Sequence, residues 1–289
     1  MNSNSEEIVL KSKSNFVSSF YFLSKEKREA LNTVYAYCRL TDDIVDEGSL
    51  AKGEKEAAKT LEEWKEKTFF AFKGKSDHPV LQELFKVVEK YKIPEDYFLE
   101  LIEGVGLDLQ KKSFLNFEEL YPYCYKVASI VGLICLEIFS YKNKKSKDYA
   151  IHLGVAFQLT NILRDIRSDA KQNRVYIPEV ELKNFGLERK DILSLSSGCN
   201  LFKEEKLENF KAMIEFQCDR AQSYYERAKE NLTEEDRSRL VAAEVMRSIY
   251  YAIFIKIKKN PFRILDARVT LSKIEYFWRL LVGWMHARL

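Results

Sequence analysis

The sequence predicts an all-α protein, and two observations carry that prediction. Its 289 residues include only 10 glycines and 5 prolines, about half the usual share of these two turn formers. Such a chain does not supply the many tight reversals of a β-sandwich or barrel, and it offers no glycine-rich phosphate loop. Apolar residues make up 46% of the chain and recur at the three- and four-residue spacing of amphipathic helices.

The chain is expected to fold as one domain. Its apolar residues are numerous enough for a substantial core. No stretch is biased enough to be an interdomain linker, and no repeat of fixed period is present. We therefore expect residues 1–289 to form a single helical domain, in which residues 1–13 are flexible.

The first long helix is expected from about Ser24 to Glu47, because Leu31, Val34 and Cys38 lie on one stripe. The same periodicity predicts further helices at 53–73, 79–92, 94–110, 117–141, 146–168, 203–231, 233–258 and 270–287.

Local signals support two of these helix starts. Pro94 precedes two acidic residues, which suits the first turn of a helix. Thr233 with Asp236 resembles a capping box at the start of the 233–258 helix. Between the helices we expect loops at 142–147, 172–190 and 194–200.

Charge and cysteine content exclude several classes of function. Lysine and arginine number 47 against 44 acidic residues, for a net charge of +3, and they form no cluster with aromatic residues, so we expect no nucleic-acid partner. The five cysteines form no CxxC pair, which favours reduced thiols and no zinc site. Residues 1–14 contain no apolar signal segment, and the apolar stretch Ile130–Phe139 is shorter than a bilayer span. We expect a cytoplasmic protein.

Two acidic clusters are candidates for metal binding. Asp42 and Asp46 lie four residues apart, so they project from one face of a helix and repel each other. Asn161, Asp165 and Asp169 form a second stripe at i, i+4 and i+8. Oxygen ligands placed in this way suit a hard divalent cation that shares its remaining positions with phosphate oxygens.

Arginines accompany both clusters, and guanidinium groups are suited to binding phosphate oxygens. Taken singly, each acidic run is typical of a solvated helix face, and each Arg–Asp neighbour pair is typical of a surface salt bridge. Their combination in one all-α chain indicates a site where Mg²⁺ bridges a diphosphate. The arginines in question are Arg39, Arg164, Arg167 and Arg174.

In these segments the sequence resembles the squalene/phytoene synthase family, which joins two prenyl diphosphates head to head. Residues 35–46 resemble its first aspartate-rich motif, and residues 158–169 with 174–178 its second. Residues 121–132 resemble its substrate-cavity helix, and residues 268–273 its basic C-terminal segment. The resemblance implies the isoprenoid synthase fold, in which both motifs face one another across a central apolar cavity.

The resemblance also implies roles for individual residues. Two or three Mg²⁺ ions would be held by Asp42, Asp46, Asn161, Asp165 and Asp169. Diphosphate oxygens would be bound by Ser14, Asn15, Arg39, Arg164, Arg174, Arg268 and Lys273. The reaction centre would be lined by Tyr35, Tyr125, Gln158 and Tyr250, and the cavity by Phe16, Phe20, Val131 and Ile134.

The resemblance implies a Mg²⁺-dependent prenyltransferase. We expect two farnesyl diphosphates to give presqualene diphosphate, which could proceed to squalene or another C30 product. The alternative is phytoene synthesis from two geranylgeranyl diphosphates. Bulky residues on the cavity helix, among them Ile134, Leu136 and Phe139, would close a cavity for C15 chains. No strand precedes Gly104-Val-Gly106, so no Rossmann-type NADPH site is expected, and other modes of NADPH binding stay open.

Three competing classes fit less well. A head-to-tail prenyltransferase would show a second DDxxD, where this chain has NxxxDxxxD. A class I terpene cyclase would show Asn, Ser/Thr and Glu at the positions of Asn161, Asp165 and Asp169. A non-catalytic helical interaction protein has no use for two metal-ready faces.

The C-terminal residues 276–288 form an amphipathic stretch with aromatic and basic members. This pattern favours a last core helix, with peripheral contact to a membrane that receives the product as the alternative.

Overall fold

The computed structural model describes residues 4–11, 15–197 and 204–288 and is helical throughout, with no strand in those ranges. One isolated parallel bridge joins Ser113 to Val175. The helices are α1 (Asn4–Lys11), α2 (Asn15–Ser18), η1 (Ser19–Phe22), α3 (Lys25–Lys52), α4 (Glu54–Ala71), α5 (Pro79–Tyr91), α6 (Glu95–Gln110), α7 (Phe117–Cys124), η2 (Tyr125–Ser129), α8 (Ile130–Phe139), α9 (Lys145–Lys171), α10 (Glu179–Asn184), α11 (Arg189–Ser194), η3 (Leu195–Ser197), α12 (Glu204–Asn231), α13 (Glu234–Arg237), α14 (Val241–Lys259), α15 (Arg263–Asp266) and α16 (Lys273–Arg288).

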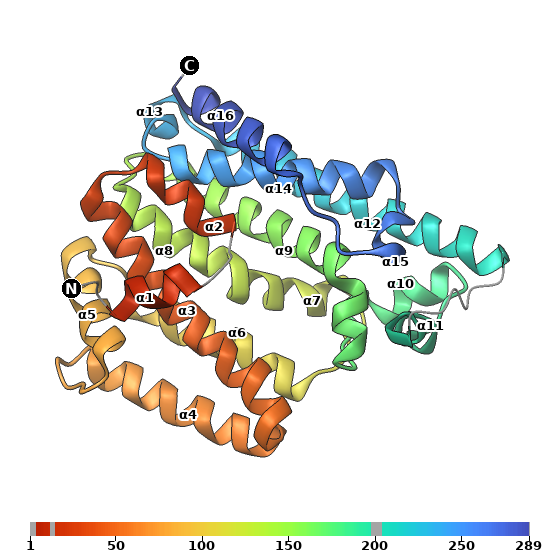
Figure 1. Ribbon diagram of the computed structural model, residues 1–289, viewed down its shortest axis with the longest axis horizontal. Helices are drawn as coiled ribbons and strands as arrows, with labels where there is room; N and C mark the ends of the chain where they lie inside the picture. The colour runs from red at the N-terminus through yellow and green to blue at the C-terminus, as the bar shows by residue number, and fades with distance from the viewer. Residues whose placement is uncertain (1–3, 12–14, 198–203, 289) are drawn as a thin grey trace.

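Helix α9 forms the centre of the molecule, where it packs against η2, α8, α12 and α14 (Figure 1). Two glycines bring it close to its neighbours. A Cβ atom on Gly154 would lie 2.5 Å from Ser129 Cα, and one on Gly132 would lie 3.0 Å from the Ala150 carbonyl oxygen. Larger side chains at these positions would separate α9 from the cavity helix.

Helix α3 organises a second group of helices with α4, α5 and α6. The rings of Tyr37, Trp64 and Phe98 pack at its centre, with centroids 5.8 Å and 5.4 Å from that of Tyr37. The indole N–H of Trp64 donates to Thr41 Oγ1 at 2.9 Å, which satisfies a buried polar group. The buried apolar residues of both groups form one continuous core, as the sequence predicts for an all-α domain.

The segment from Tyr121 to Phe139 is not a uniform α-helix. Pro122 lies inside α7, and η2 is a π-helix of five residues between α7 and α8. Such π segments are rare and often occur at functional sites. On length and composition alone the run Phe117–Phe139 could span a bilayer, yet 56% of its apolar window is buried inside the protein, where α8 contributes to the core.

The structure corrects several predicted boundaries. Residues 1–13 are predicted to be flexible, whereas Asn4–Lys11 form α1, which packs on α3 and buries Val9. The predicted 172–190 loop contains α10 and begins α11.

The predicted helix at 233–258 is divided into α13 and α14, and its predicted capping box does not form, because Thr233 makes no capping bond. Asp236 accepts hydrogen bonds from the backbone N–H groups of Lys142 and Asn143, each at 2.8 Å, and from Ser146 Oγ at 2.7 Å. This carboxylate therefore secures the start of the distant helix α9.

Candidate active site

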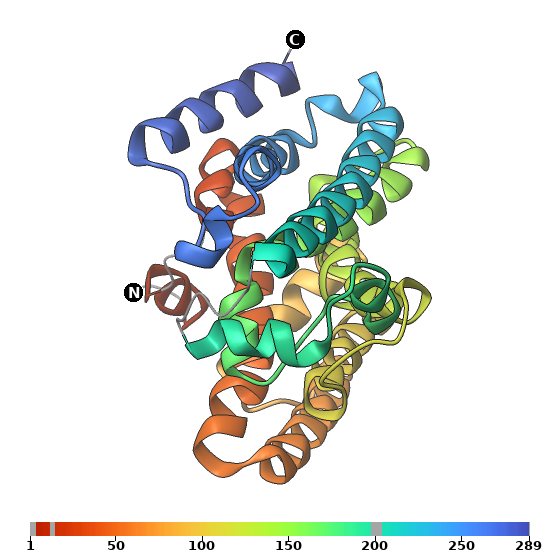
Figure 2. The same cartoon turned by 90° about the vertical axis from the view of Figure 1, so that its right-hand side faces the viewer.

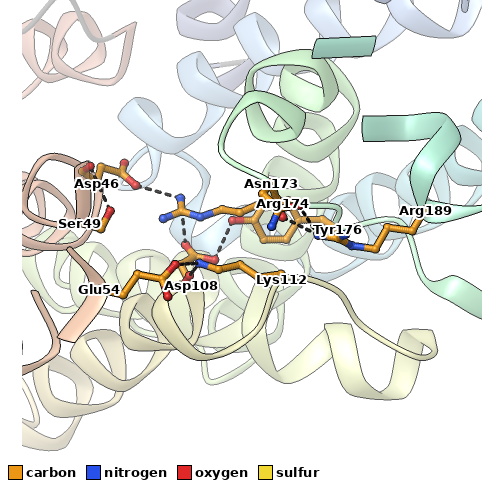
Figure 3. A network of polar contacts seen from close by, with 9 residues as sticks. All are labelled: Asp46, Ser49, Glu54, Asp108, Lys112, Asn173, Arg174, Tyr176 and Arg189. Carbon is orange, nitrogen blue, oxygen red and sulfur yellow. Dashed lines mark hydrogen bonds and ion pairs between the residues drawn. The ribbon is translucent and has the colours of Figure 1, made fainter. Parts of the chain in front are cut away.

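The two acidic clusters come together where α3 and α9 end. Arg174 follows α9 by three residues, and its Nη1 donates to Asp46 Oδ1 on α3 at 2.9 Å (Figure 3). The same Nη1 lies 4.0 Å from Asp108 Oδ2 at the end of α6. The Arg174 side chain is 9% exposed, so one buried guanidinium connects three helices at this point.

Asp108, Tyr123 and Tyr176 belong to this network and were not among the residues selected from the sequence. The Tyr176 hydroxyl donates to Asp108 Oδ1 at 2.7 Å, and the Tyr123 hydroxyl donates to Oδ2 at 3.2 Å. Burial raises the pKa of both tyrosines well above the usual value, so both hydroxyls stay protonated. The available signal for Asp108 is that it is the one charged residue among residues 104–110.

Backbone contacts fix the segment that carries Arg174 and Tyr176. The N–H of Val175 donates to the Lys112 carbonyl at 3.0 Å. Arg189 Nη2 donates to the Asn173 carbonyl at 2.7 Å, and Lys112 pairs with Glu54 at 2.7 Å (Figure 3). The backbone is therefore held in place on both sides of Arg174.

On the second face, two arginines bind one carboxylate. Arg164 donates to Asp165 through Nε at 3.1 Å and Nη2 at 2.5 Å, and Arg268 does so at 2.6 and 3.0 Å. Burial acts to raise the pKa of Asp165, but these hydrogen bonds outweigh it and hold the pKa below its usual value. Arg167 Nη1 donates to the carbonyls of Leu265 and Asp266, which fixes the loop that carries Arg268.

Two other carboxylates have no cationic partner within ion-pair distance in the described part of the chain. Burial, and then the charge of Asp165, raise the pKa of Asp169 to about 8. Asp42 is exposed, yet the protein around its carboxylate, and then Asp46, raise its pKa to about 7. The Oδ1 atom of Asn161 is buried without a hydrogen-bond partner.

These three groups fit a divalent cation. A hard cation would supply the positive charge that Asp42 and Asp169 lack and the partner that Asn161 Oδ1 lacks. Within the described residues, no three histidine, cysteine or carboxylate side chains converge closely enough to hold a metal ion by themselves. Oxygens from a bound ligand or from water would therefore have to complete each coordination shell.

An apolar cavity of about 200 Å³ begins beside the second face. Gln158 and Asn161 line its polar end, one turn before Asp165, and Tyr149 lines it further along α9. Tyr149 and Asn161 are twelve residues apart, which is about 18 Å of helix. The remaining walls come from Ser19, Phe20, Val127, Ala128, Val131, Gly132, Cys135, Leu136, Phe139, Ala150, Leu153, Gly154, Phe157, Leu240, Ala242, Ala243, Met246 and Tyr250.

Aromatic and cationic groups meet at the polar end of this cavity. The Tyr250 ring packs against that of Phe157, with centroids 4.5 Å apart and the ring planes tilted by 30°. The Arg164 guanidinium carbon lies 5.9 Å from the Tyr250 ring centroid. A ligand in the cavity would thus contact aromatic faces next to a guanidinium group.

Three residues predicted for the reaction centre or the cavity do not line this cavity. Tyr125 does not line the cavity. Burial raises the pKa of Tyr125, followed by the effects of Glu100 and Tyr97, which both lie on α6. Tyr125 is therefore located beside α6. The η2 segment explains the difference, since uniform helical spacing fails there. Ile134 is fully buried in the core and is not part of the cavity wall, and Tyr35 is half-buried against the core rather than in that wall.

Arg39 and Lys273, two of the predicted diphosphate ligands, are exposed, as is Arg268. Arg39 pairs with Asp43 at 2.6 Å and with Glu47 at 3.6 Å. Lys273 is exposed at the first residue of α16. Ser14 lies outside the described residues, as do the side chains of Asn15 and Phe16.

The sequence of this chain matches the family model described as "Squalene/phytoene synthase" over residues 9–275. The phytoene synthase of Mycobacterium tuberculosis is 32% identical over 270 residues, which cover 93% of this chain and 86% of that protein. The 15-cis-phytoene synthase of Synechococcus elongatus is 29% identical, with 92% and 86% covered. The chain spans 61% of the chloroplastic phytoene synthase of Narcissus pseudonarcissus, at 28% identity.

Solved structures agree with this fold. The squalene synthase HpnC of Alicyclobacillus acidocaldarius superimposes with a TM-score of 0.76 at 25% identity, covering 89% of this chain and 93% of that one. A dehydrosqualene synthase superimposes with a TM-score of 0.78 at 24% identity, covering 98% and 95%.

Proposed function

Because this chain belongs to the squalene/phytoene synthase family, whose members are prenyltransferases, we propose that it joins two allylic prenyl diphosphates head to head. The observation that carries the proposal is the pairing of two features. Arginines and uncompensated carboxylates surround one end of the site, and an apolar cavity leads away from that end. A diphosphate fits the first, and a prenyl chain fits the second.

The positive side chains would hold the two diphosphates. Arg164, Arg174 and Arg268 present planar guanidinium groups that suit bidentate contact with phosphate oxygens. Mg²⁺, held by Asp42 and Asp46 on one face and by Asn161, Asp165 and Asp169 on the other, would supply positive charge that stabilises a departing diphosphate. We propose two or three such ions.

The cavity would protect a carbocation. Loss of diphosphate from one substrate leaves an allylic cation, which the 2,3-double bond of the second substrate attacks, and proton loss closes a cyclopropane. The apolar walls exclude water from this intermediate. The faces of Phe157 and Tyr250 lie where they can stabilise positive charge on carbon.

We propose two farnesyl diphosphates as substrates and presqualene diphosphate as the product, formed without NADPH. Leu136 and Phe139 line the cavity, and their bulk supports a choice of C15 over C20 chains. The phytoene synthase names of the relatives favour a second candidate, in which two geranylgeranyl diphosphates give phytoene. We further propose that the protein is cytoplasmic and meets the inner face of a membrane peripherally, since either product has long hydrocarbon chains.

The test incubates pure protein with Mg²⁺ and either the C15 or the C20 diphosphate, and identifies the lipid product. Presqualene diphosphate from the C15 substrate supports the proposal, and the Asp165→Ala variant should form none. Phytoene from the C20 substrate, with little product from the C15 substrate, would contradict the proposed substrate and support the head-to-head reaction. Squalene formed only with NADPH adds a reductive second step. A cyclised product of a single chain would contradict the head-to-head reaction.

A further inference from the structure

The last helix, α16, has two apolar faces, and only one of them is covered. Its inner face packs on α14, where a Cβ atom on Gly283 would lie 2.5 Å from Val245 Cα, and Ala287 is buried. Tyr276 contacts Ser18, which holds the beginning of the helix. The predicted last core helix is therefore a surface helix, of which only the inner face packs against the rest of the protein.

The outer face of α16 carries the largest exposed aromatic side chains of the C-terminal region. Ile274 is 74% exposed, Phe277 60%, Trp278 58% and Met285 41%. Their spacing places them, with the half-exposed Leu281, along one side of the helix. We call these five residues the α16 outer face. Figures 1 and 2 show α16 at the periphery, with α14 beneath it. A contiguous exposed apolar face of this kind marks an interaction surface.

Basic residues border this face. Lys273 and Arg288 lie beside this face at the two ends of α16, and the only acidic residue of the helix, Glu275, is paired with Lys256 at 2.7 Å. The helix therefore presents an excess of positive charge beside its exposed apolar side chains. Apolar side chains bordered by lysine and arginine suit the interface of an anionic lipid bilayer. Tryptophan also favours that interface, because its ring is apolar and its N–H can stay hydrated.

The position of α16 relative to the cavity supports the same partner. Leu240, Ala243, Met246 and Tyr250, in or just before α14, line the cavity. The helix α14 is packed between this cavity and α16. A bilayer against the α16 outer face would therefore lie one helix away from the hydrocarbon chains of the product.

We propose that the α16 outer face docks on an anionic membrane surface, with the helix lying flat in the interface. This proposal names the partner for the peripheral contact of the proposed function and rests on it. The occupant is a lipid surface rather than a second copy of the chain, because the bordering basic residues would repel one another across a symmetric contact.

The experiment measures flotation of the full chain with vesicles of phosphatidylcholine alone or mixed with phosphatidylglycerol, without substrate or Mg²⁺. Wild type should bind the mixed vesicles, and added salt should weaken that binding. The Phe277→Ser/Trp278→Ser variant should bind these vesicles at least about tenfold more weakly than wild type. Phe69→Ser/Phe70→Ser is the matched control, since these adjacent phenylalanines are 46% and 50% exposed on α4 and should leave binding unchanged.

A second measurement reports on the face directly. Of the three tryptophans, Trp278 is the one on the α16 outer face. Vesicles should shift the tryptophan emission to the blue, and Trp278→Phe should remove most of that shift while binding persists. Equal vesicle binding by the Phe277→Ser/Trp278→Ser variant overturns the proposal. A wild-type dimer that this variant converts to a monomer would also overturn it, in favour of a second copy. Absence of prenyltransferase activity, with vesicle binding intact, would instead contradict the proposed function.

Discussion

The two acidic faces use the same residue types but balance their charge differently. On α3, Asp46 accepts one hydrogen bond from Arg174 and its side chain is 44% exposed, and Asp42 has no cation. On α9, Asp165 is 17% exposed and binds two guanidinium groups, and Asp169 has none. Each face thus has one neutralised and one uncompensated carboxylate, but the α9 face carries far more of the positive charge.

The difference indicates a division of labour. The α3 face has little positive charge of its own, so its contribution to the proposed diphosphate binding would depend on a metal ion. The α9 face already holds Arg164 and Arg268, whose guanidinium groups can exchange a carboxylate partner for a phosphate partner. Removing the uncompensated Asp42 from one face and the paired Asp165 from the other should therefore have similar effects on activity and different effects on stability.

The largest expected effect is on turnover. Asp42→Ala and Asp165→Ala should each lower kcat by roughly 10²- to 10³-fold or more, because each removes an oxygen ligand that would position positive charge on the diphosphate. The measurement is steady-state product formation at saturating Mg²⁺. Near wild-type turnover for either variant would remove that face from the metal site.

Asp42→Ala and Asp165→Ala should change the free energy of unfolding of the metal-free protein differently. Asp42→Ala should leave the free energy of unfolding unchanged or raise it, since it relieves repulsion with Asp46. Asp165→Ala should lower it by about 1–3 kcal/mol, because Arg164, only 10% exposed, loses its carboxylate. Denaturant titrations with EDTA measure both. Equal changes in the two variants would show that the ion pairs of Asp165 contribute no net stability.

Arg174 connects the two faces, so its substitution tests whether they act together. Arg174→Ala should lower kcat/KM by about 100-fold and destabilise the fold, since Asp46 and the buried Asp108 lose their guanidinium partner. Arg174→Lys should recover part of the stability but little of the activity, because lysine lacks the planar fork. Full activity of the lysine variant would show that charge alone suffices at this position.

A smaller effect distinguishes two neighbouring tyrosines. Tyr123→Phe should lower kcat by about tenfold, because Asp108 loses a hydroxyl donor and its own position beside Arg174 is weakened. Tyr125→Phe is the matched control and should leave kcat unchanged, since Tyr125 lies beside α6. The reverse order of effects would restore the assignment made from sequence.

The smallest expected effect is on the pH dependence of stability. The pKa of Asp169 is raised to about 8 in the fold, against about 3.9 in the unfolded chain. Its protonation therefore contributes stability that is complete below about pH 4 and lost as the pH rises through about 8. In metal-free protein at pH 8.5, Asp169→Asn should therefore be more stable than wild type by about 1 kcal/mol, or roughly 2–4 °C in Tm. Mg²⁺ should raise the Tm of wild type more than that of the variant.

The sequence predicts the helices better than the network between them. The periodicity that places a helix at 24–47 depends on residues three and four apart, and α3 does form there. Asp108, Tyr123 and Tyr176 come from separate segments and meet only through the packing of α6, α7 and the residues after α9. No local pattern contains that meeting point.

The same limit explains the misassigned cap. Asp236 lies three residues after Thr233, which fits a local capping box, but its carboxylate bonds to backbone N–H groups 93 and 94 residues away in sequence. Tertiary packing brings the start of α9 within reach, and several distant donors outcompete one local donor. The acidic clusters were easier to recognise because each lies within a single helix.

The length of the π-helix η2 determines which side chains of α8 face the cavity. In an α-helix each residue turns the chain by about 100°, so one deletion between Tyr125 and Ser129 would rotate all of α8 relative to α7. Val131 and Gly132 would then leave the cavity wall, and the Gly132 contact with Ala150 would be lost. The shape of the apolar cavity is thus encoded by the number of residues in one turn as much as by their identity. Deletion of Lys126, which does not line the cavity, would remodel the cavity without removing any side chain that lines it.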